Sequence, residues 1–196
     1  MRAASAIIVL LAALGMAWYS TRGQFHRVPP AGQWPEPSQS FSSHETWQVG
    51  DQKITALASY DITATVLSTE RYYMDNGASL SPIDLAVGWG PMSDYDLARQ
   101  LNLSQGGRWF RYRVPGKQFP ISYDEINSHA ANVHIIPADE TIRGRVLSVR
   151  AGEVIHMIGR LVEATNGKGK WRSSLSRTDT GAGACELLWV ERIDWQ

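Results

Sequence analysis

The chain has 196 residues, 43% of them hydrophobic, and its 19 basic side chains balance 19 acidic ones. This apolar content excludes a chain that is disordered throughout. Zero net charge argues against a protein that binds nucleic acid through its phosphates or that lies on an anionic membrane surface. The length is enough for one domain with its own core.

The first predicted element is a membrane helix. Residues 3–19 form an uncharged run that follows Arg2, close to the length that a helix needs to cross about 30 Å of hydrocarbon. Trp18 and Tyr19 at its end are typical of a membrane–water interface. A cleaved signal peptide is the alternative, and both interpretations predict export. We expect residues 1–22 to be an uncleaved signal anchor.

A linker and then an exported domain are expected to follow. Basic residues flank the apolar run on both sides, so the positive-inside rule does not orient the helix. Its place at the start of the chain, like that of an export signal, favours an inward N-terminus and an outward domain. Residues 23–43 are rich in Pro and Ser, a composition typical of a semi-extended linker. Residues 44–196 are therefore assigned to one globular domain.

The first half of this domain predicts short elements separated by turns. Gly50-Asp51 indicates a turn before a half-buried strand at 60–69, where apolar residues alternate with polar ones. Residues 80–91 have Pro and Gly at both ends and predict a turn-helix with an ordered loop. Ser93 is expected to cap a short helix that ends near Leu101.

The second half predicts more strands than helices. Ser122 and Glu125 have the spacing of a capping box, and Asp139 is a second candidate helix cap. Asn166-Gly167 is a strong hairpin signal. The expected strands are 108–114, 153–164, 170–176 and 186–193, and the expected helices are 123–129 and 140–149.

Strand pairs joined by turns favour antiparallel pairing. We therefore predict an α+β fold, mainly antiparallel, in which a partly closed OB-like β-barrel carries short helices and follows one N-terminal membrane helix. A sheet with helices on one face is the alternative.

The loop at 173–185, SSLSRTDTGAGAC, is the strongest candidate for a ligand site. Its glycines permit close backbone approach, and successive N–H groups there can form a nest for a phosphate or carboxylate, joined by nearby arginines. A flexible hairpin connection is the plainer interpretation of the same loop, and the favoured one. We expect ligand contacts from this region and from the loops at 80–94 and 128–137. The predicted ligand-binding residues are Arg172, Arg177, Thr180, Gly181, Gly183, Trp89 and Asn132.

A second hypothesis makes Cys185 a nucleophile, with His129 or His134 as its base. The order His, Cys and then Arg192, behind an N-terminal anchor, is similar to that of sortase-type cysteine transpeptidases, although the sortase signature Thr-Leu-x-Thr-Cys is absent. An ordinary buried thiol is the competing interpretation. Because Cys185 is the only cysteine, no internal disulfide is expected.

No metal site and no cofactor are predicted. His129 and His134 are five residues apart, a spacing that does not bring two ligands together on one helix face, and no HExxH-type motif accompanies them. A polar loop whose side chains bind their own backbone is the favoured interpretation of this segment.

Three segments together resemble a family of uncharacterised bacterial membrane-anchored proteins: LSPIDLAVGWGPMSD at 80–94, SHAANVHIIPAD at 128–139 and WRSSLSRTDTGAGACELLWVE at 171–191. The resemblance implies a cell-envelope setting. It implies no activity, cofactor or substrate.

The expected protein is thus single-pass in the bacterial inner membrane, held by residues 3–19, with its globular domain in the periplasm. The favoured function is non-enzymatic binding of a small ligand or of an envelope partner protein, without nucleic acid. A cysteine-dependent envelope hydrolase or transpeptidase is the alternative.

Overall fold

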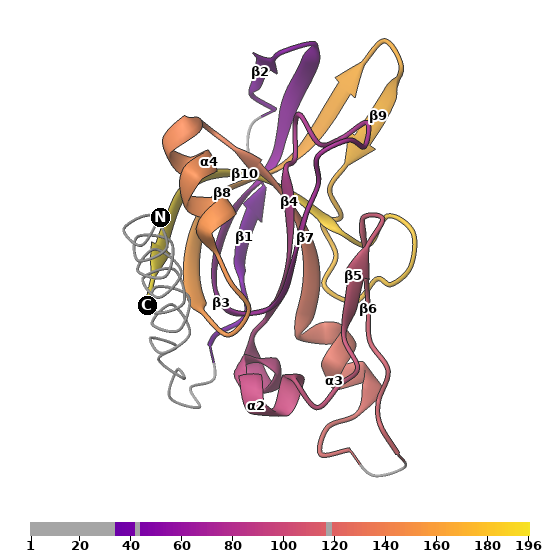
Figure 1. Ribbon diagram of the computed structural model, residues 1–196. Helices are drawn as coiled ribbons and strands as arrows, with labels where there is room; N and C mark the ends of the chain where they lie inside the picture. The colour runs from indigo at the N-terminus through magenta and orange to yellow at the C-terminus, as the bar shows by residue number, and fades with distance from the viewer. Residues whose placement is uncertain (1–33, 42–43, 117–118) are drawn as a thin grey trace, which may run out of the picture.

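The computed structural model describes residues 34–41, 44–116 and 119–196, which form a mostly β domain with few, short helices (Figure 1). The predicted membrane helix at 3–19 lies outside these residues. Within the described ranges no helix is both long enough and apolar enough to cross a bilayer.

Five strands form a ring at the centre of the domain. Each is hydrogen-bonded to two others, in the order β3-β4-β7-β10-β8 and back to β3. The β7–β10 pair is parallel and the other four pairs are antiparallel, so the sheet is mixed. The ring strands are β3 (Gln52–Arg71), β4 (Ile83–Gly88), β7 (Ala130–Pro137), β8 (Val154–Asn166) and β10 (Glu186–Trp195).

Alternation along the long strands puts one set of side chains inside the ring. Tyr60, Ile62 and Ala64 of β3 belong to the main core cluster together with Leu188 and Val190 of β10. Register shifts in β3 and β10 mark irregularities where such strands can bend around a closed core. The core therefore lies within the ring, and the strand ends and outer faces remain to form sites.

One glycine is required where β8 meets β10. A Cβ atom placed on Gly159 would lie 1.9 Å from the backbone oxygen of Trp189. Because a backbone atom cannot move aside as a side-chain tip can, only glycine allows this close approach.

Three strands extend the sheet beyond the ring. β1 (Ser38–Phe41) and β2 (Thr46–Val49) pair with β3, and β9 (Gly169–Arg172) pairs with β8. β1 differs from the sequence-based expectation, which ended the linker at residue 43. Backbone pairing with β3 orders this polar segment, and the nearby side chain of Pro37 is buried.

β4 corrects the turn-helix prediction for 80–91. All six of its residues are buried, so the strand lacks the polar–apolar alternation by which half-buried strands are recognised. The prolines and glycines at its ends mark turns on either side of a strand.

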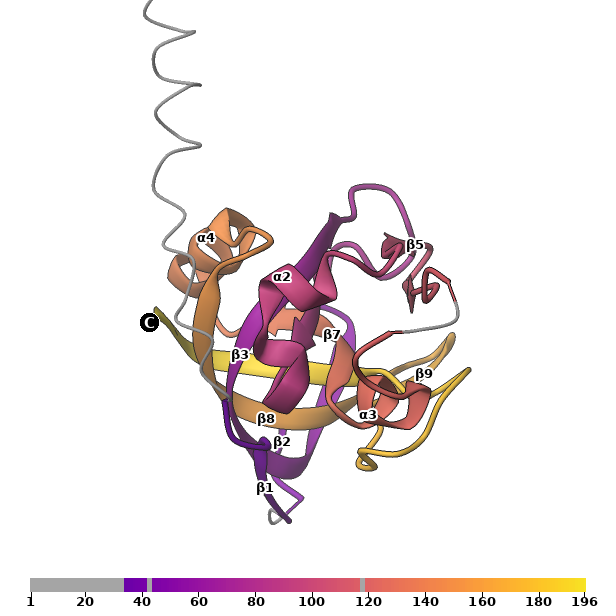
Figure 2. The same cartoon turned by 90° about the horizontal axis from the view of Figure 1, so that it is seen from below.

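Two helix caps were predicted correctly. α3 (Tyr123–Ser128) begins with a capping box between Ser122 and Glu125, and the side chain of Asp139 caps α4 (Glu140–Ser148). Figure 2 shows these two helices on opposite sides of the ring.

The helix predicted after Ser93 is shorter and has a different cap. The 3-10 turn η1 (Gly90–Ser93) precedes α2 (Tyr95–Ala98), which is capped by Asp94. Ser93 is buried, and its hydroxyl accepts a hydrogen bond from the backbone N–H of Trp34 at 3.0 Å. Ser93 therefore holds the N-terminal segment against the ring.

The strand predicted at 108–114 is reduced to one arm of a small hairpin. β5 (Ser104–Gly106) pairs with β6 (Trp109–Arg111), and the two form a separate two-stranded sheet. A side-chain hydrogen bond of 2.7 Å from Gln105 to Asn132 ties this hairpin to β7. The hairpin thus lies against the outer side of the ring.

Candidate functional site

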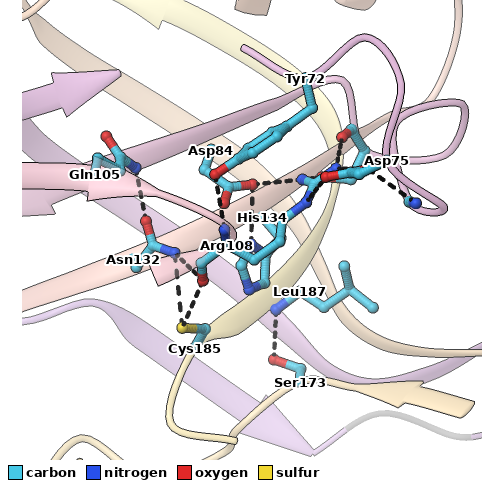
Figure 3. A network of polar contacts seen from close by, with 12 residues as sticks. Tyr72, Asp75, Asp84, Gln105, Arg108, Asn132, His134, Ser173, Cys185 and Leu187 are labelled. Atoms are coloured by element: carbon cyan, nitrogen blue, oxygen red, sulfur yellow. Dashed lines mark hydrogen bonds and ion pairs between the residues drawn. The ribbon is translucent and has the colours of Figure 1, made fainter. Parts of the chain in front are cut away.

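A buried acid–arginine cluster lies on the outer face of β4 and β7 (Figure 3). Asp84 of β4 is completely buried. Its Oδ1 atom lies 2.8 Å from Nη1 of Arg108 and 2.9 Å from Nδ1 of His134. No hydrogen bond reaches its other oxygen, Oδ2, from the residues that the structure describes.

Arg108 reaches this cluster from the turn of the β5–β6 hairpin. Gly107 and Arg108 both have positive φ, 60° and 68°, as the central residues of a type I′ turn must. Arg108 is the one non-glycine residue with positive φ among the described residues. This conformation costs about 1–2 kcal/mol, so the contacts of the side chain have to hold it.

Every N–H group of the Arg108 guanidinium has a partner. Nε and Nη2 donate to the two carboxylate oxygens of Asp75 at 2.9 and 2.8 Å. Nη1 donates to Asp84 and to the hydroxyl of Ser81, and Nη2 also donates to the backbone oxygen of Ser81 at 2.9 Å. The bidentate bond holds the pKa of Asp75 below its usual range. This side chain fastens the 72–82 loop to the ring.

Aromatic rings enclose the same guanidinium. Its central carbon lies 3.6 Å from the ring centre of Tyr72 and 5.3 Å from that of Trp171, within the range of cation–π attraction. Tyr72 is also held by the backbone N–H of Arg108, which donates to its hydroxyl at 3.0 Å. Mainly because of burial, the pKa of Tyr72 rises to about 12.

His134 is held away from the solvent. Its ring lies 4.8 Å from that of Trp171. The distance from Nδ1 to Asp84 suits an ion pair, but the ring is not aligned for a hydrogen bond. The sequence predicted His134 as a possible base without predicting its carboxylate neighbour.

Cys185, the predicted nucleophile, lies near this cluster at the start of β10. Its sulfur lies 3.7 Å from the side-chain nitrogen of Asn132 and 4.0 Å from the backbone oxygen of Arg108. Burial raises the pKa of the thiol, and the Asn132 contact opposes that shift. No hydrogen bond joins Cys185 to a histidine within the described residues.

His129, the other predicted base, belongs to a different environment. Its Nδ1 atom lies 2.8 Å from the backbone oxygen of Glu125, and its ring centre lies 6.5 Å from that of Trp89. No group of three or more possible metal ligands occurs among the described residues either.

A pocket of about 150 Å³ opens beside Cys185, between the 173–185 loop, the β5–β6 hairpin and the end of the ring. Its walls combine four aromatic side chains with amides, carboxyls and one arginine. The residues that matter most for the argument below are Trp89, Tyr112, Arg177, Asp179, Ala184 and Glu186.

Glu186 is the most unusual member of this lining. It is 2% exposed, and its Oε1 atom lies 3.3 Å from Nη1 of Arg177, longer than the 2.7–2.9 Å of a strong charge-assisted bond. Its Oε2 atom has no hydrogen-bond partner among the described residues. Burial raises its pKa to about 8; Arg177 opposes this rise and Asp179 adds to it.

Trp89 contributes a second buried polar atom. The residue is 2% exposed, and its indole N–H has no acceptor among the residues described. Buried polar groups in proteins nearly always have a partner. Two residues with such groups, Glu186 and Trp89, thus line one small pocket.

Five of the seven predicted ligand-binding residues line this pocket. Trp89 directly follows β4, Asn132 belongs to β7, and the loop contributes Arg177, Thr180 and Gly181. The structure thus brings together residues from three separate segments, and their binding role stays a prediction.

Arg172 and Gly183 lie outside the pocket lining. Arg172 pairs instead with Glu163 across the β8–β9 hairpin at 2.7 Å. Gly183 adopts a φ of +89°, in the exposed part of the loop.

Sequence reasoning missed Glu186, Asp84 and Arg108. The signal for the two acids was a charged residue inside an otherwise apolar strand, Cys-Glu-Leu-Leu at 185–188 and Ile-Asp-Leu-Ala at 83–86. Charged side chains are seldom fully buried without a special reason. Arg108 was instead assigned to the strand expected at 108–114.

A second, wider groove of about 900 Å³ lies on the other side of Arg108. The 75–80 loop and the β8–β9 turn form its walls, and its lining includes Asp75, Lys168, Lys170 and Trp171. Acidic and basic side chains are mixed there, so the groove shows no preference for one sign of charge.

Comparisons with models of protein families, with curated proteins and with solved structures found no match to this chain.

Proposed function

We propose that the chain is a ligand-binding domain, tethered to the bacterial inner membrane by residues 3–19 and exposed to the periplasm, that holds a small molecule in the pocket beside Glu186. The observation that carries the proposal is a pocket with two lining residues, Glu186 and Trp89, that each have a buried side-chain atom without a hydrogen-bond partner among the described residues, Oε2 and Nε1. Such atoms each cost about 1–3 kcal/mol when no partner is present.

The topology supports a finer assignment of the fold to a partly closed OB-like barrel. Five strands return to the first, and the third and fifth of them, β7 and β10, are parallel. OB-type barrels bind ligands on the face of their second and third strands and at the loops that join strands one to two and four to five. Here these are β4, β7 and the chain segments 72–82 and 167–185, where both hollows lie.

OB-type barrels bind oligonucleotides as well as other ligands. The net charge of zero argues against nucleic acid here, because binding to phosphates requires a basic surface. The mixed charges of the wide groove agree with this argument. A small molecule therefore suits the domain better.

The sharpest test fills the pocket without disturbing the core. Ala184 lines the pocket from the loop, whereas Ala182 is exposed on the same loop and lies outside the lining. Full-length protein in mild detergent would be screened against small-molecule fragments by ligand-observed NMR. We expect fragments that bind the wild type and Ala182→Phe to be lost in Ala184→Phe. Hits that survive in Ala184→Phe would place binding elsewhere.

The proposed location has its own test. The apolar run at 3–19 and the aromatic pair after it support an uncleaved anchor. We expect the full-length protein to stay in the membrane pellet after alkaline carbonate washing and to be digested by protease added to spheroplasts. Release by the wash, or protection until the cells are lysed, would contradict the location.

The alternative function, a cysteine-dependent hydrolase or transpeptidase, has one supporting observation. Nδ1 of His134 lies 2.9 Å from Asp84, although the ring is not aligned for the hydrogen bond by which a carboxylate orients a catalytic imidazole. The raised pKa of Cys185 acts in the opposite direction, since a nucleophilic thiol needs a low pKa. Binding is therefore the function that the geometry supports better.

A further inference from the structure

One wall of the pocket is aromatic and open to solvent. Trp109 belongs to this wall and is 39% exposed, although tryptophan is highly buried on average. Arg111 lies over the same ring, 5.4 Å from its centre, and helps to hold its plane. Phe110 and Tyr112 extend the wall. Because the face of an aromatic ring is the negative part of its quadrupole, this wall suits a ligand with a flat face of weakly positive C–H groups.

Polar groups within reach of solvent complete the lining. Thr180 is exposed, and its hydroxyl can donate and accept a hydrogen bond at the same time. Asn127 is half-buried, and within the described residues its one side-chain hydrogen bond is the 2.6 Å bond that it accepts from Tyr112. Its NH₂ group can therefore donate to a ligand, and the exposed carboxylate of Asp179 can accept. A ligand that meets all these groups needs several groups that both donate and accept.

The charges of the lining favour an uncharged ligand. Among its described residues, one arginine, Arg177, stands against two carboxyl groups, Glu186 and Asp179. Arg177 lies 3.3 Å from Glu186 and also donates to the backbone oxygen of Ser176 and the side chain of Gln39. The three charges sum to zero or to one negative charge, depending on whether Glu186 holds a proton. No positive charge is left over for an anion, and the exposed charge of Asp179 is screened by solvent.

The size and the topology of the site narrow the class further. About 150 Å³ of space is less than the 300–1,000 Å³ typical of drug-sized ligands, so one small ring fills it. OB-type barrels bind oligonucleotides and oligosaccharides at the strands and loops that surround this pocket. The net charge of zero argues against the first of these classes.

We infer that the pocket binds one uncharged pyranose sugar ring, with its C–H face on the indole of Trp109 and its hydroxyls on Thr180 and Asn127. A pyranose has such a face, it carries no charge, and each of its hydroxyls both donates and accepts. This inference rests on the proposed ligand-binding function and names the class of ligand.

The experiment titrates hexoses onto the full-length protein by saturation-transfer NMR, in a detergent whose head group is not a sugar. The probes are glucose, galactose and mannose. Each is compared with its uronate, which is anionic, and with its 2-amino sugar, which is cationic. Cyclohexylmethanol is the ring of similar size without the ring hydroxyls. We expect at least one hexose to bind about tenfold or more tightly than its two charged analogues and cyclohexylmethanol, because unpaired charges and missing hydroxyls each oppose binding.

Two tryptophan variants test the stacking contact. Trp109→Ala should weaken that hexose about tenfold or more, since tryptophans at binding sites contribute large shares of the affinity. Trp109→Phe keeps an aromatic face and should recover most of the loss. Trp195→Ala is the matched control, because Trp195 is 38% exposed and its indole donates to Glu153, outside the pocket lining.

A threonine pair tests the hydroxyl contact without changing the size of the side chain. Thr180→Val should weaken the hexose about threefold, the effect of one lost hydrogen bond. Thr46→Val, at an exposed position on β2, should leave the affinity unchanged. If Trp109→Ala fails to fold, Trp109→Phe and Thr180→Val still decide. Unchanged affinity in Thr180→Val or in folded Trp109→Ala would overturn the inference, and so would a set of hexoses without the stated preference.

Failure of the inference is distinct from failure of the proposed function. If a uronate, an amino sugar or cyclohexylmethanol binds best and Ala184→Phe abolishes that binding, the pocket binds ligands but the assigned class is wrong. If no probe binds, the sugar inference is overturned, and the fragment screen with Ala184→Phe and Ala182→Phe then decides the proposed function separately.

Discussion

Two buried carboxylates, Asp84 and Glu186, each face one arginine, but the geometry of the two contacts differs. Asp84 receives a 2.8 Å bond from Arg108, whose guanidinium has a partner for every N–H group. Glu186 lies 3.3 Å from Arg177, and its pKa is raised to about 8. Both acids keep one oxygen without a hydrogen-bond partner among the described residues, so the two pairs differ in how firmly the arginine is held.

The difference follows from the elements that supply each arginine. Arg108 belongs to a two-residue turn whose φ angles are fixed by the hairpin, so its side chain enters the cluster in one direction. Arg177 belongs to a loop without regular structure, and its other polar contacts are to Gln39 and Ser176. A loop residue can adjust to a ligand more readily than a turn residue in a closed network.

The largest expected effect comes from Arg108→Met. Removing one partner of a buried pair leaves the other charge uncompensated, which costs about 3–5 kcal/mol. Arg177→Met should cost less than half of that, because Glu186 can remain protonated. Denaturant unfolding of the full-length protein in detergent, monitored by tryptophan fluorescence, would measure both free energies, with exposed Arg113→Met as the control. Equal losses in the free energy of unfolding for Arg108→Met and Arg177→Met would show that the two buried pairs do not differ in strength.

The next prediction is that Glu186 makes the stability of the domain depend on pH. The folded-state pKa of Glu186 lies above its ordinary value of 4.5, so the folded state binds more protons between these values. Its stabilising contribution is complete below pH 4.5 and is lost as the pH rises through 8. Glu186→Gln should therefore flatten the fall in stability between pH 5 and 9 by at least about 1.4 kcal/mol, the equivalent of one pKa unit. A slope that the variant leaves intact would exclude this role.

The reactivity of the Cys185 thiol depends on both carboxyls. Burial raises the pKa of the thiol, and the nearby carboxyls of Glu186 and Asp84 raise it further when they are ionised. We expect iodoacetamide at pH 7.5 to alkylate Cys185 at least tenfold more slowly than an exposed cysteine introduced as Ser79→Cys in a Cys185→Ser background, as mass spectrometry would show. Alkylation of Cys185 as fast as that of the exposed thiol would revive the nucleophile hypothesis.

The smallest effect is expected at the surface. Arg172 pairs with Glu163 at 2.7 Å, and both Arg172 and Lys170 lower the pKa of that carboxyl. Exposed pairs contribute about 0–1 kcal/mol, so Arg172→Gln should destabilise the domain by less than about 1 kcal/mol, measured in the same unfolding experiment and increasingly masked by salt. If Arg172→Gln lowered the free energy of unfolding as much as Arg108→Met does, exposure would not explain why the two pairs differ in stability.

Much of the fold could be predicted because local rules determined it. The capping box at Ser122 and Glu125, the Asp139 cap and the alternation within 60–69 depend on neighbouring residues alone. β4 could not be predicted in this way, because burial on both faces removes the alternation that identifies a strand.

The site was less accessible to sequence reasoning. Glycine and arginine in the 173–185 loop indicated its general position, and five of the predicted residues line one pocket. Arg177 and Glu186 are nine residues apart, and Asp84 and Arg108 are 24 apart, so each pairing depends on how a loop or a hairpin folds back and not on a local spacing rule. Sequence patterns carry no record of such pairings until the ring order is known.

The position of β10 has a consequence for how the protein is made. This strand comes last of the five in chain order but lies between β7 and β8, so the ring cannot close until β10 has left the ribosome. Glu186 is the first residue of β10 and Cys185 directly precedes it, so the pocket cannot form before that strand has been made. Until then β7 and β8 each lack one of their two partners in the ring.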